Sequence, residues 1–205
     1  MAYTMKKLIV SAAFFFIATL AGKAQDKVTE PSTGKSFESK VVVSYDGTDY
    51  VQQLTGVTVR KKLMFKVYGM AHYMQDPTHM SKEEAFEAIL TDGKAKQIVM
   101  SFVRDVDREK IKDAYWDGFK ENASVGDVQK MQPLIEQFVS FFSNDVKEND
   151  QFVLRWLPGG VIMANVQGEE KPVIKDKLFA RTLWAIWFGE DSIVHRDDLV
   201  SRIVK

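Results

Sequence analysis

The fold is decided by two neighbouring stretches, which read GVTVR at residues 56–60 and FKVYGMAHYM at residues 65–74. Both are rich in β-branched and aromatic residues, and they predict long strands at about residues 52–61 and 63–75. Side chains alternate between the two faces of a strand, so Tyr68 and Tyr73 are expected on opposite faces of the second one. One face would carry Met64, Lys66, Tyr68, Met70 and His72, and the other Phe65, Val67, Gly69, Ala71 and Tyr73.

Outward from these strands, β-forming runs are interrupted by amphipathic helical patterns. Ser81 with Glu84 forms a capping box, and Pro158-Gly159-Gly160 is the turn of a hairpin. Helices clustered between runs of antiparallel strands indicate an α+β domain, with a long antiparallel sheet covered by helices on one face. The expected helices span about 81–90, 107–122, 133–142, 176–188 and 196–204, and the further strands about 41–43, 96–104, 151–157 and 161–166.

The N-terminus has the three parts of a secretory signal peptide, which we expect to span residues 1–24. Lys6 and Lys7 precede an apolar run at 8–21, and Ala24 offers a cleavage site. A polar, breaker-rich segment at 25–36 is expected to be a flexible arm, and 37–205 a single domain. The leader predicts an exported protein, periplasmic or secreted, without an integral membrane segment after processing. The chain has no cysteine, which fits an oxidising compartment and equally the cytosol.

Composition excludes several classes of function. The chain has 28 basic and 28 acidic side chains, so it offers no electrostatic footprint for nucleic acid. The three histidines, His72, His79 and His195, have no spacing that makes a metal site, and no thiol or nucleophile-elbow serine is present. We therefore expect neither a metal nor a cofactor, and no catalytic residue is assigned.

In combination, several stretches in register carry a resemblance to the exported bacterial branch of the chalcone isomerase-like family. They are GVTVR and FKVYGMAHYM, FVRDV at 102–106, the helix at 107–122, Val161 in the hairpin, DKLFAR at 176–181 and IWFG at 186–189. The resemblance implies an open-faced β-sandwich, in which a long antiparallel sheet carries a layer of helices with a ligand cleft between them. Plant members of this family are of two kinds, chalcone isomerases and fatty-acid binders without known catalysis.

The resemblance also implies site residues. The arginine with which the enzymes hold their substrate falls on Arg60, and the second-strand position falls on Tyr68. The positions of the helix tyrosine and asparagine fall on Asp107 and Ala114, and that of a late serine or threonine on Ala180. Three of the five groups that position the substrate are therefore missing, although an alignment shifted by one would place Tyr115 nearer the cleft.

The chemistry of an arginine in a cleft can be stated without the family. An unpaired guanidinium in apolar surroundings costs several kcal/mol, so a buried Arg60 needs a protein carboxylate or a bound anion. The leading interpretation is a non-enzymatic carrier of a fatty acid or similar amphipathic carboxylate, with Arg60 and Tyr68 at the head group and Tyr73 in reserve. An isomerase acting on an unsaturated ketone and a structural or protein-binding module remain as alternatives, and the oligomeric state stays open.

Overall fold

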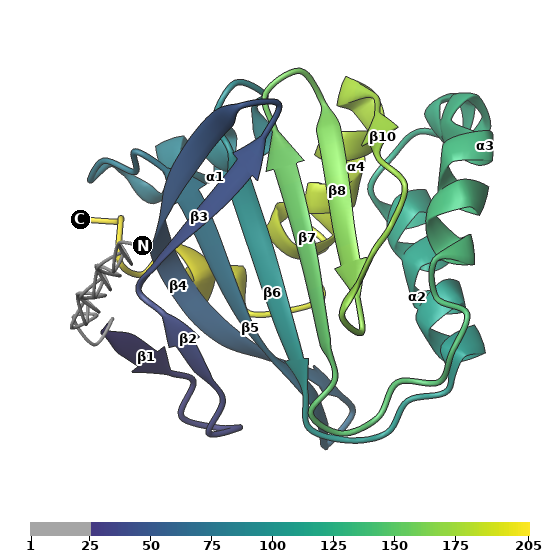
Figure 1. Cartoon of the computed structure of the whole chain (residues 1–205), viewed down its shortest axis with the longest axis horizontal. Helices are drawn as coiled ribbons and strands as arrows, with labels where there is room; N and C mark the ends of the chain where they lie inside the picture. Colours follow the sequence, from purple (N-terminus) through teal and green to yellow (C-terminus); the bar gives the residue numbers. More distant parts are fainter. Residues whose placement is uncertain (1–25) are drawn as a thin grey trace, which may run out of the picture.

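The computed structural model describes residues 26–205 and contains one long, curled antiparallel sheet (Figure 1). The strands follow the order β10-β8-β7-β6-β5-β4-β3, and β9 pairs with β8. Their bounds are β3 (Lys40–Tyr45), β4 (Thr48–Lys62), β5 (Phe65–Gln75), β6 (Lys96–Phe102), β7 (Gln151–Leu157), β8 (Val161–Val166), β9 (Glu169–Glu170) and β10 (Ile174–Lys175). The expected α+β class and the sheet are confirmed.

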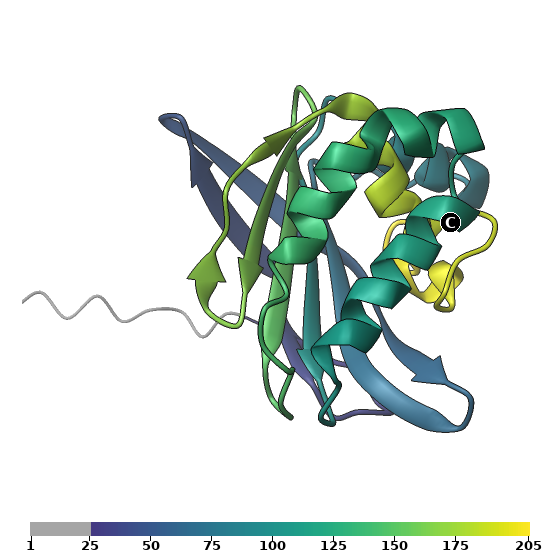
Figure 2. The ribbon, with the colours of Figure 1, turned by 90° about the vertical axis from the view of Figure 1, so that its right-hand side faces the viewer.

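Helices cover one face of this sheet, as the two views show (Figures 1 and 2). They are α1 (Lys82–Leu90), α2 (Arg108–Glu121), α3 (Val125–Ser140), α4 (Lys177–Phe188) and the short 3-10 helix η1 (Arg196–Val200). The apolar helix α4 is buried along nearly its whole length, and the ring of its Trp184 lies 5.5 Å from that of Trp156 in β7. This aromatic layer between sheet and helices is the main core. None of the helices in the described part of the chain has the length and apolar character needed to cross a bilayer.

Helix α3 begins earlier than the sequence suggested. We expected Pro133 in the first turn, but the helix starts after Ser124, whose hydroxyl accepts a hydrogen bond from the Asp127 amide. Pro133 lies inside the helix, where it removes one backbone donor and its ring crowds a carbonyl of the preceding turn. The cap at Ser124 therefore outweighs the proline as a start signal.

The segment before the domain forms a hairpin instead of the expected flexible arm. Strands β1 (Lys27–Thr29) and β2 (Ser36–Glu38) pair, and Phe37 packs with Leu54, Ala71 and Tyr73 on the sheet face opposite the helices. This apolar contact explains why the segment is ordered. The predicted signal peptide lies outside the described residues.

Two bulges interrupt the pairing of β4 with β5 and break the expected alternation of side chains. Leu54 pairs with Tyr73 and Gly56 with His72, so Thr55 is an extra residue in β4. Leu54 therefore faces the β1–β2 hairpin, whereas Arg60, which has the same parity, faces the helices. A second extra residue, Val67, lies in β5, because Arg60 pairs with Tyr68 and Lys61 with Lys66. As a result, Phe65 and Val67 lie on the helical side with Tyr68, and Lys66 reaches Ser32 on the other side.

The first bulge, at Thr55, forms the contact between β4 and η1. The Thr55 hydroxyl donates to the Leu199 carbonyl at 2.7 Å and lies 2.7 Å from Nδ1 of His72. Since the hydroxyl proton is engaged, Nδ1–H of His72 is the donor in this second bond. Nε2 of the fully buried His72 has no hydrogen-bond partner among residues 26–205.

The buried His72 makes the stability of the fold sensitive to acid. Burial, with a smaller effect of Lys96, holds the pKa of His72 well below its ordinary value of 6.5. His72 is therefore protonated in the unfolded chain at a pH at which it stays neutral in the native state. The stability present above pH 6.5 is lost as the pH falls. We expect a loss of about 1.4 kcal/mol for each pH unit between 6.5 and the folded-state pKa. Urea unfolding from about pH 7.5 to about pH 5 measures this loss of stability. The variant His72→Asn keeps a donor toward Thr55, and its free energy of unfolding should depend less steeply on pH. Identical slopes of stability against pH in both proteins would contradict the prediction.

Candidate ligand cleft

A cleft of about 440 Å³ is lined by residues of α2 and of the β4–β5 hairpin. Figure 2 shows that the hairpin curls toward the helical side of the sheet. The hairpin supplies one wall and α2, with the loop before it, supplies the other, while Ile193 closes one end. The wall residues are Arg60, Lys62, Leu63, Phe65, Val67 and Tyr68 from the hairpin, and Arg104 to Asp107, Lys110, Ile111, Ala114, Asp117, Gly118 and Glu121 from the other side. Its volume lies within the range of small-molecule sites.

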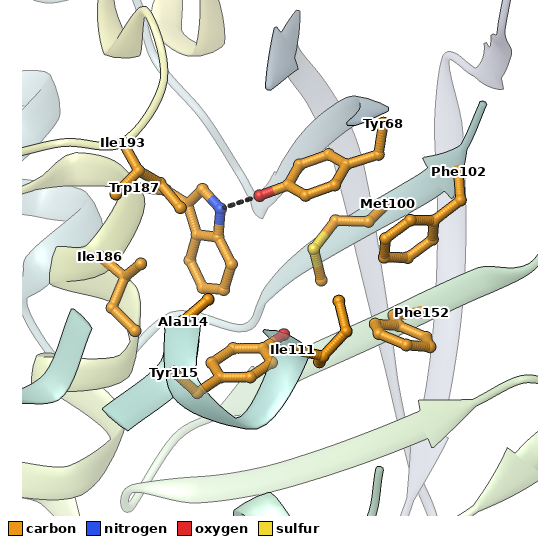
Figure 3. Close-up of a pocket in the computed structure, with 10 residues that line it drawn as sticks. All are labelled: Tyr68, Met100, Phe102, Ile111, Ala114, Tyr115, Phe152, Ile186, Trp187 and Ile193. Carbon is orange, nitrogen blue, oxygen red and sulfur yellow. Dashed lines mark hydrogen bonds between the residues drawn. The ribbon is translucent and has the colours of Figure 1, made fainter. Parts of the chain in front are cut away.

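Behind the cleft lies a smaller apolar pocket of about 50 Å³ (Figure 3). It shares Tyr68, Ile111, Ala114 and Ile193 with the cleft, so the two hollows are neighbours separated by these side chains. Its remaining walls are Met100, Phe102, Tyr115, Phe152, Ile186 and Trp187. This volume admits a small group and is too small for a long chain unless flexible side chains such as Met100 move.

Arg60 lies half-buried in the cleft wall. Its Nη1 donates to the carbonyls of Ile193 at 2.5 Å and Lys61 at 2.9 Å. No carboxylate of the described residues forms an ion pair with it. Two carbonyl contacts fix the position of the guanidinium but leave its charge uncompensated, and its other N–H groups are available to an acceptor.

Tyr68 lies directly across the β4–β5 ladder from Arg60 and marks the boundary between cleft and inner pocket. Its hydroxyl accepts a hydrogen bond from Nε1 of Trp187 at 3.0 Å (Figure 3). Burial raises the pKa of Tyr68, and the Trp187 bond and the Arg60 charge offset only part of this. The hydroxyl therefore keeps its proton and can donate it to a ligand.

Tyr115 from α2 was considered only through a shifted alignment, yet it lines the inner pocket (Figure 3). Its ring stacks on Phe142 at 4.8 Å, and no hydrogen bond reaches its hydroxyl from the chain between residues 26 and 205. Burial, and secondarily Tyr68, raises the pKa of Tyr115 well above 10.0. The signal that could have identified it is its place on the apolar stripe of α2, next to Ala114.

The other candidate positions divide between cleft and core. Asp107 and Ala114 line the cleft, and Asp107 also caps α2 by accepting from the Glu109 amide at 2.8 Å. Ala180 is fully buried in α4 and borders neither hollow. Tyr73 is also buried, but under the β1–β2 hairpin on the opposite sheet face, so it does not serve as the reserve ligand contact. Strand alternation predicted opposite faces for Tyr68 and Tyr73, as the structure has them, but it did not say which of the two lines the cleft.

The site is suited to binding an anion attached to an apolar body. One unpaired guanidinium and two neutral phenols can stabilise negative charge on oxygen. Groups of three or more histidine, cysteine or carboxylate side chains that could hold a metal ion do not occur within the described residues. The outer rim is mixed in charge, with Arg104, Lys62 and Lys110 among four carboxylates.

Comparisons with known proteins agree with this architecture. A solved structure, the crystal structure of a fatty-acid binding protein from Arabidopsis thaliana, matches with a TM-score of 0.66 and 19% sequence identity. The match covers 87% of this chain and 97% of the plant protein. No curated protein sequence matches. The family model described as chalcone isomerase-like matches residues 34–198, and the chain therefore belongs to the chalcone isomerase-like family.

Proposed function

We propose that this protein is an exported, non-catalytic binding protein for a fatty acid or a similar amphipathic carboxylate. The carboxylate would lie at the boundary between cleft and inner pocket, where Arg60 and Tyr68 meet. The similarity of the fold to a plant fatty-acid binding protein supports the class of ligand. The signal-peptide pattern at residues 1–24 supports export, and a periplasmic or secreted location.

The single observation that carries the proposal is the half-buried guanidinium of Arg60 without a carboxylate partner in the described chain. A carboxylate presents two oxygens that match the planar donors of arginine. The Tyr68 hydroxyl, held by Trp187, can add a third hydrogen bond to the same head group. A bound anion would thus supply the missing charge.

The apolar part of the ligand would be bound by the cleft wall. Leu63, Phe65, Val67, Ile111 and Ile193 provide apolar surface along it. Each buried methylene contributes about 0.8 kcal/mol, so six or more outweigh the head-group interaction. Chain length, more than head-group chemistry, should therefore set the affinity.

Mass spectrometry of what co-purifies with the protein tests this function. The domain is extracted with organic solvent, and the same is done for Arg60→Ala and for the control Arg181→Ala, which removes an exposed arginine of α4. We expect an amphipathic carboxylate in the wild type and in the control, and a loss of about tenfold or more in Arg60→Ala. Absence of lipid from all three samples, or equal lipid in all three, would count against the carrier.

One observation favours the isomerase as a second candidate. The unpartnered Tyr115 hydroxyl and Arg60 could together stabilise an oxyanion formed from an unsaturated ketone. Turnover of a chalcone that disappears in Arg60→Ala and in Tyr115→Phe would replace the carrier by this enzyme. Asp107, Ala114 and Ala180 stand where the family's enzymes have a tyrosine, an asparagine and a serine or threonine. Because these three groups are missing, we expect no turnover.

A further inference from the structure

The tip of the β4–β5 hairpin carries the two most accessible large apolar side chains of the described residues, Leu63 and Met64, and the exposed Phe65 follows them. Leu63 is 91% exposed, Met64 84% and Phe65 55%. They are consecutive, and the hairpin carries them away from the sheet on the helical side, beyond the end of α2 (Figure 2). Single exposed apolar residues are common, but three together at a projecting turn indicate a contact surface.

The backbone of this turn is also unusual. Lys62 pairs with Phe65, so Leu63 and Met64 form a two-residue turn, and Leu63 adopts a φ of 55°. Glycine, asparagine and aspartate favour this conformation at such a turn, whereas a branched apolar side chain is strained there. A leucine that is both strained and almost fully exposed contributes nothing to the fold, which indicates that its side chain serves a contact outside it.

Basic residues surround the apolar tip. The segment from Arg60 to Lys66 contains four cations and no acid, and Lys61 and Lys62 are exposed. Two of the four carboxylates that line the cleft, Asp105 and Asp107, are engaged by Lys147 at 3.0 Å and by the N-terminus of α2. Exposed apolar side chains flanked by lysines complement the surface of a bilayer that contains anionic lipids.

We propose that Leu63, Met64 and Phe65 insert into the interfacial region of an anionic bilayer, with the surrounding lysines against its head groups. Lys62, Leu63 and Phe65 also line the cleft, so this orientation turns the cleft mouth toward the membrane. An amphipathic ligand could then pass between bilayer and cleft without crossing water. This last step rests on the proposed function, whereas docking itself does not require a ligand.

Vesicle co-sedimentation of the ligand-free domain tests docking. Vesicles of phosphatidylcholine alone are compared with vesicles that also contain phosphatidylglycerol, at low and high salt. We expect binding only to the anionic vesicles, weakened by salt, and about tenfold weaker in Met64→Ser. The control Val125→Ser removes another exposed apolar side chain, 77% accessible at the start of α3, and should bind like the wild type.

A second variant separates docking from folding. Leu63→Asn relieves the strained turn, so its melting temperature should equal or exceed that of the wild type while vesicle binding falls. Equal binding of Met64→Ser and wild type, or no binding of the wild type to anionic vesicles, overturns the proposal. A wild-type dimer that Met64→Ser dissociates, found by analytical ultracentrifugation, would assign the tip to a second copy instead.

The two proposals fail separately. Met64 does not line the cleft. Organic-solvent extraction of purified Met64→Ser should therefore yield as much ligand as the wild type, while its binding to vesicles is lost. Docking without any extractable ligand would refute the carrier alone, and ligand without docking would refute the membrane contact alone.

Discussion

Gly56→Ala is expected to lower the free energy of unfolding by at least about 3 kcal/mol, because the added methyl group meets backbone. An ideal Cβ at Gly56 would lie 2.0 Å from the carbonyl oxygen of Asp198 and 2.6 Å from the carbonyl carbon of Leu199. Neither atom belongs to a flexible side chain, so η1 would have to move off β4. That movement would also break the hydrogen bond from Thr55 to Leu199.

The control for this experiment is Gly126→Ala in the first turn of α3. No atom lies within 4 Å of a Cβ at Gly126, and alanine favours a helix over glycine by about 0.5–1 kcal/mol. In urea unfolding followed by circular dichroism, the midpoint of Gly56→Ala should therefore lie below that of the wild type and the midpoint of Gly126→Ala above it. Equal midpoints for Gly56→Ala and the wild type would mean that η1 is not packed on β4 as described.

Asp92→Ala is expected to destabilise the domain by about 3 kcal/mol, because one carboxylate holds several donors together. It accepts hydrogen bonds from the amides of Gly159 and Gly160 at 3.1 and 3.2 Å, and from Nε1 of Trp156 at 3.2 Å. Lys177, in the first turn of α4, adds an ion pair at 3.3 Å. Alanine would leave the donor of the fully buried Trp156 without a partner.

The pH dependence gives this prediction a second readout. Partial burial opposes ionisation, but the bonds from Gly160, Lys177, Gly159 and Trp156 outweigh it and lower the pKa of Asp92 below 3.8. The contribution of the ionised Asp92 to the free energy of unfolding is therefore present above its unfolded-state pKa. It is lost as the pH falls through the folded-state pKa. The difference in urea midpoint between wild type and Asp92→Ala should shrink in acid. The control Asp113→Ala removes an exposed carboxylate inside α2, and it should change the free energy of unfolding only through helix propensity, by at most about 0.7 kcal/mol. A constant difference would contradict the role of the charge.

Features encoded by neighbouring residues were predictable from the sequence. Ser81 with Glu84, and Asp176, cap their helices as expected, because the capping atoms lie within three positions. The same holds for the turn at 158–160 between β7 and β8. The start of α3 was predicted wrongly at Pro133, because proline is typical of the first turn of a helix. The signal that marks the true start is the cap at Ser124.

Features that depend on distant partners could not be predicted. The role of Asp92 could not be predicted, because its donors Trp156, Gly159 and Gly160 lie 64 to 68 positions away. Thr55 shows no local sign of a bulge, since its reason is the Leu199 carbonyl 144 positions later. The cleft residue Arg60 was identified through the family resemblance. For Tyr115 the apolar stripe predicts burial, but its place in the inner pocket depends on how α2 packs on the sheet.

The extra residue at Thr55 reaches η1 without changing how the rest of β4 pairs with β5. Deleting its codon would restore strict alternation, yet Arg60 would still pair with Tyr68 and face the helices. The deletion would remove only the hydroxyl that donates to the Leu199 carbonyl. Relatives of this protein could thus lose this tie between β4 and η1 by a single in-frame deletion and keep the arginine in the cleft.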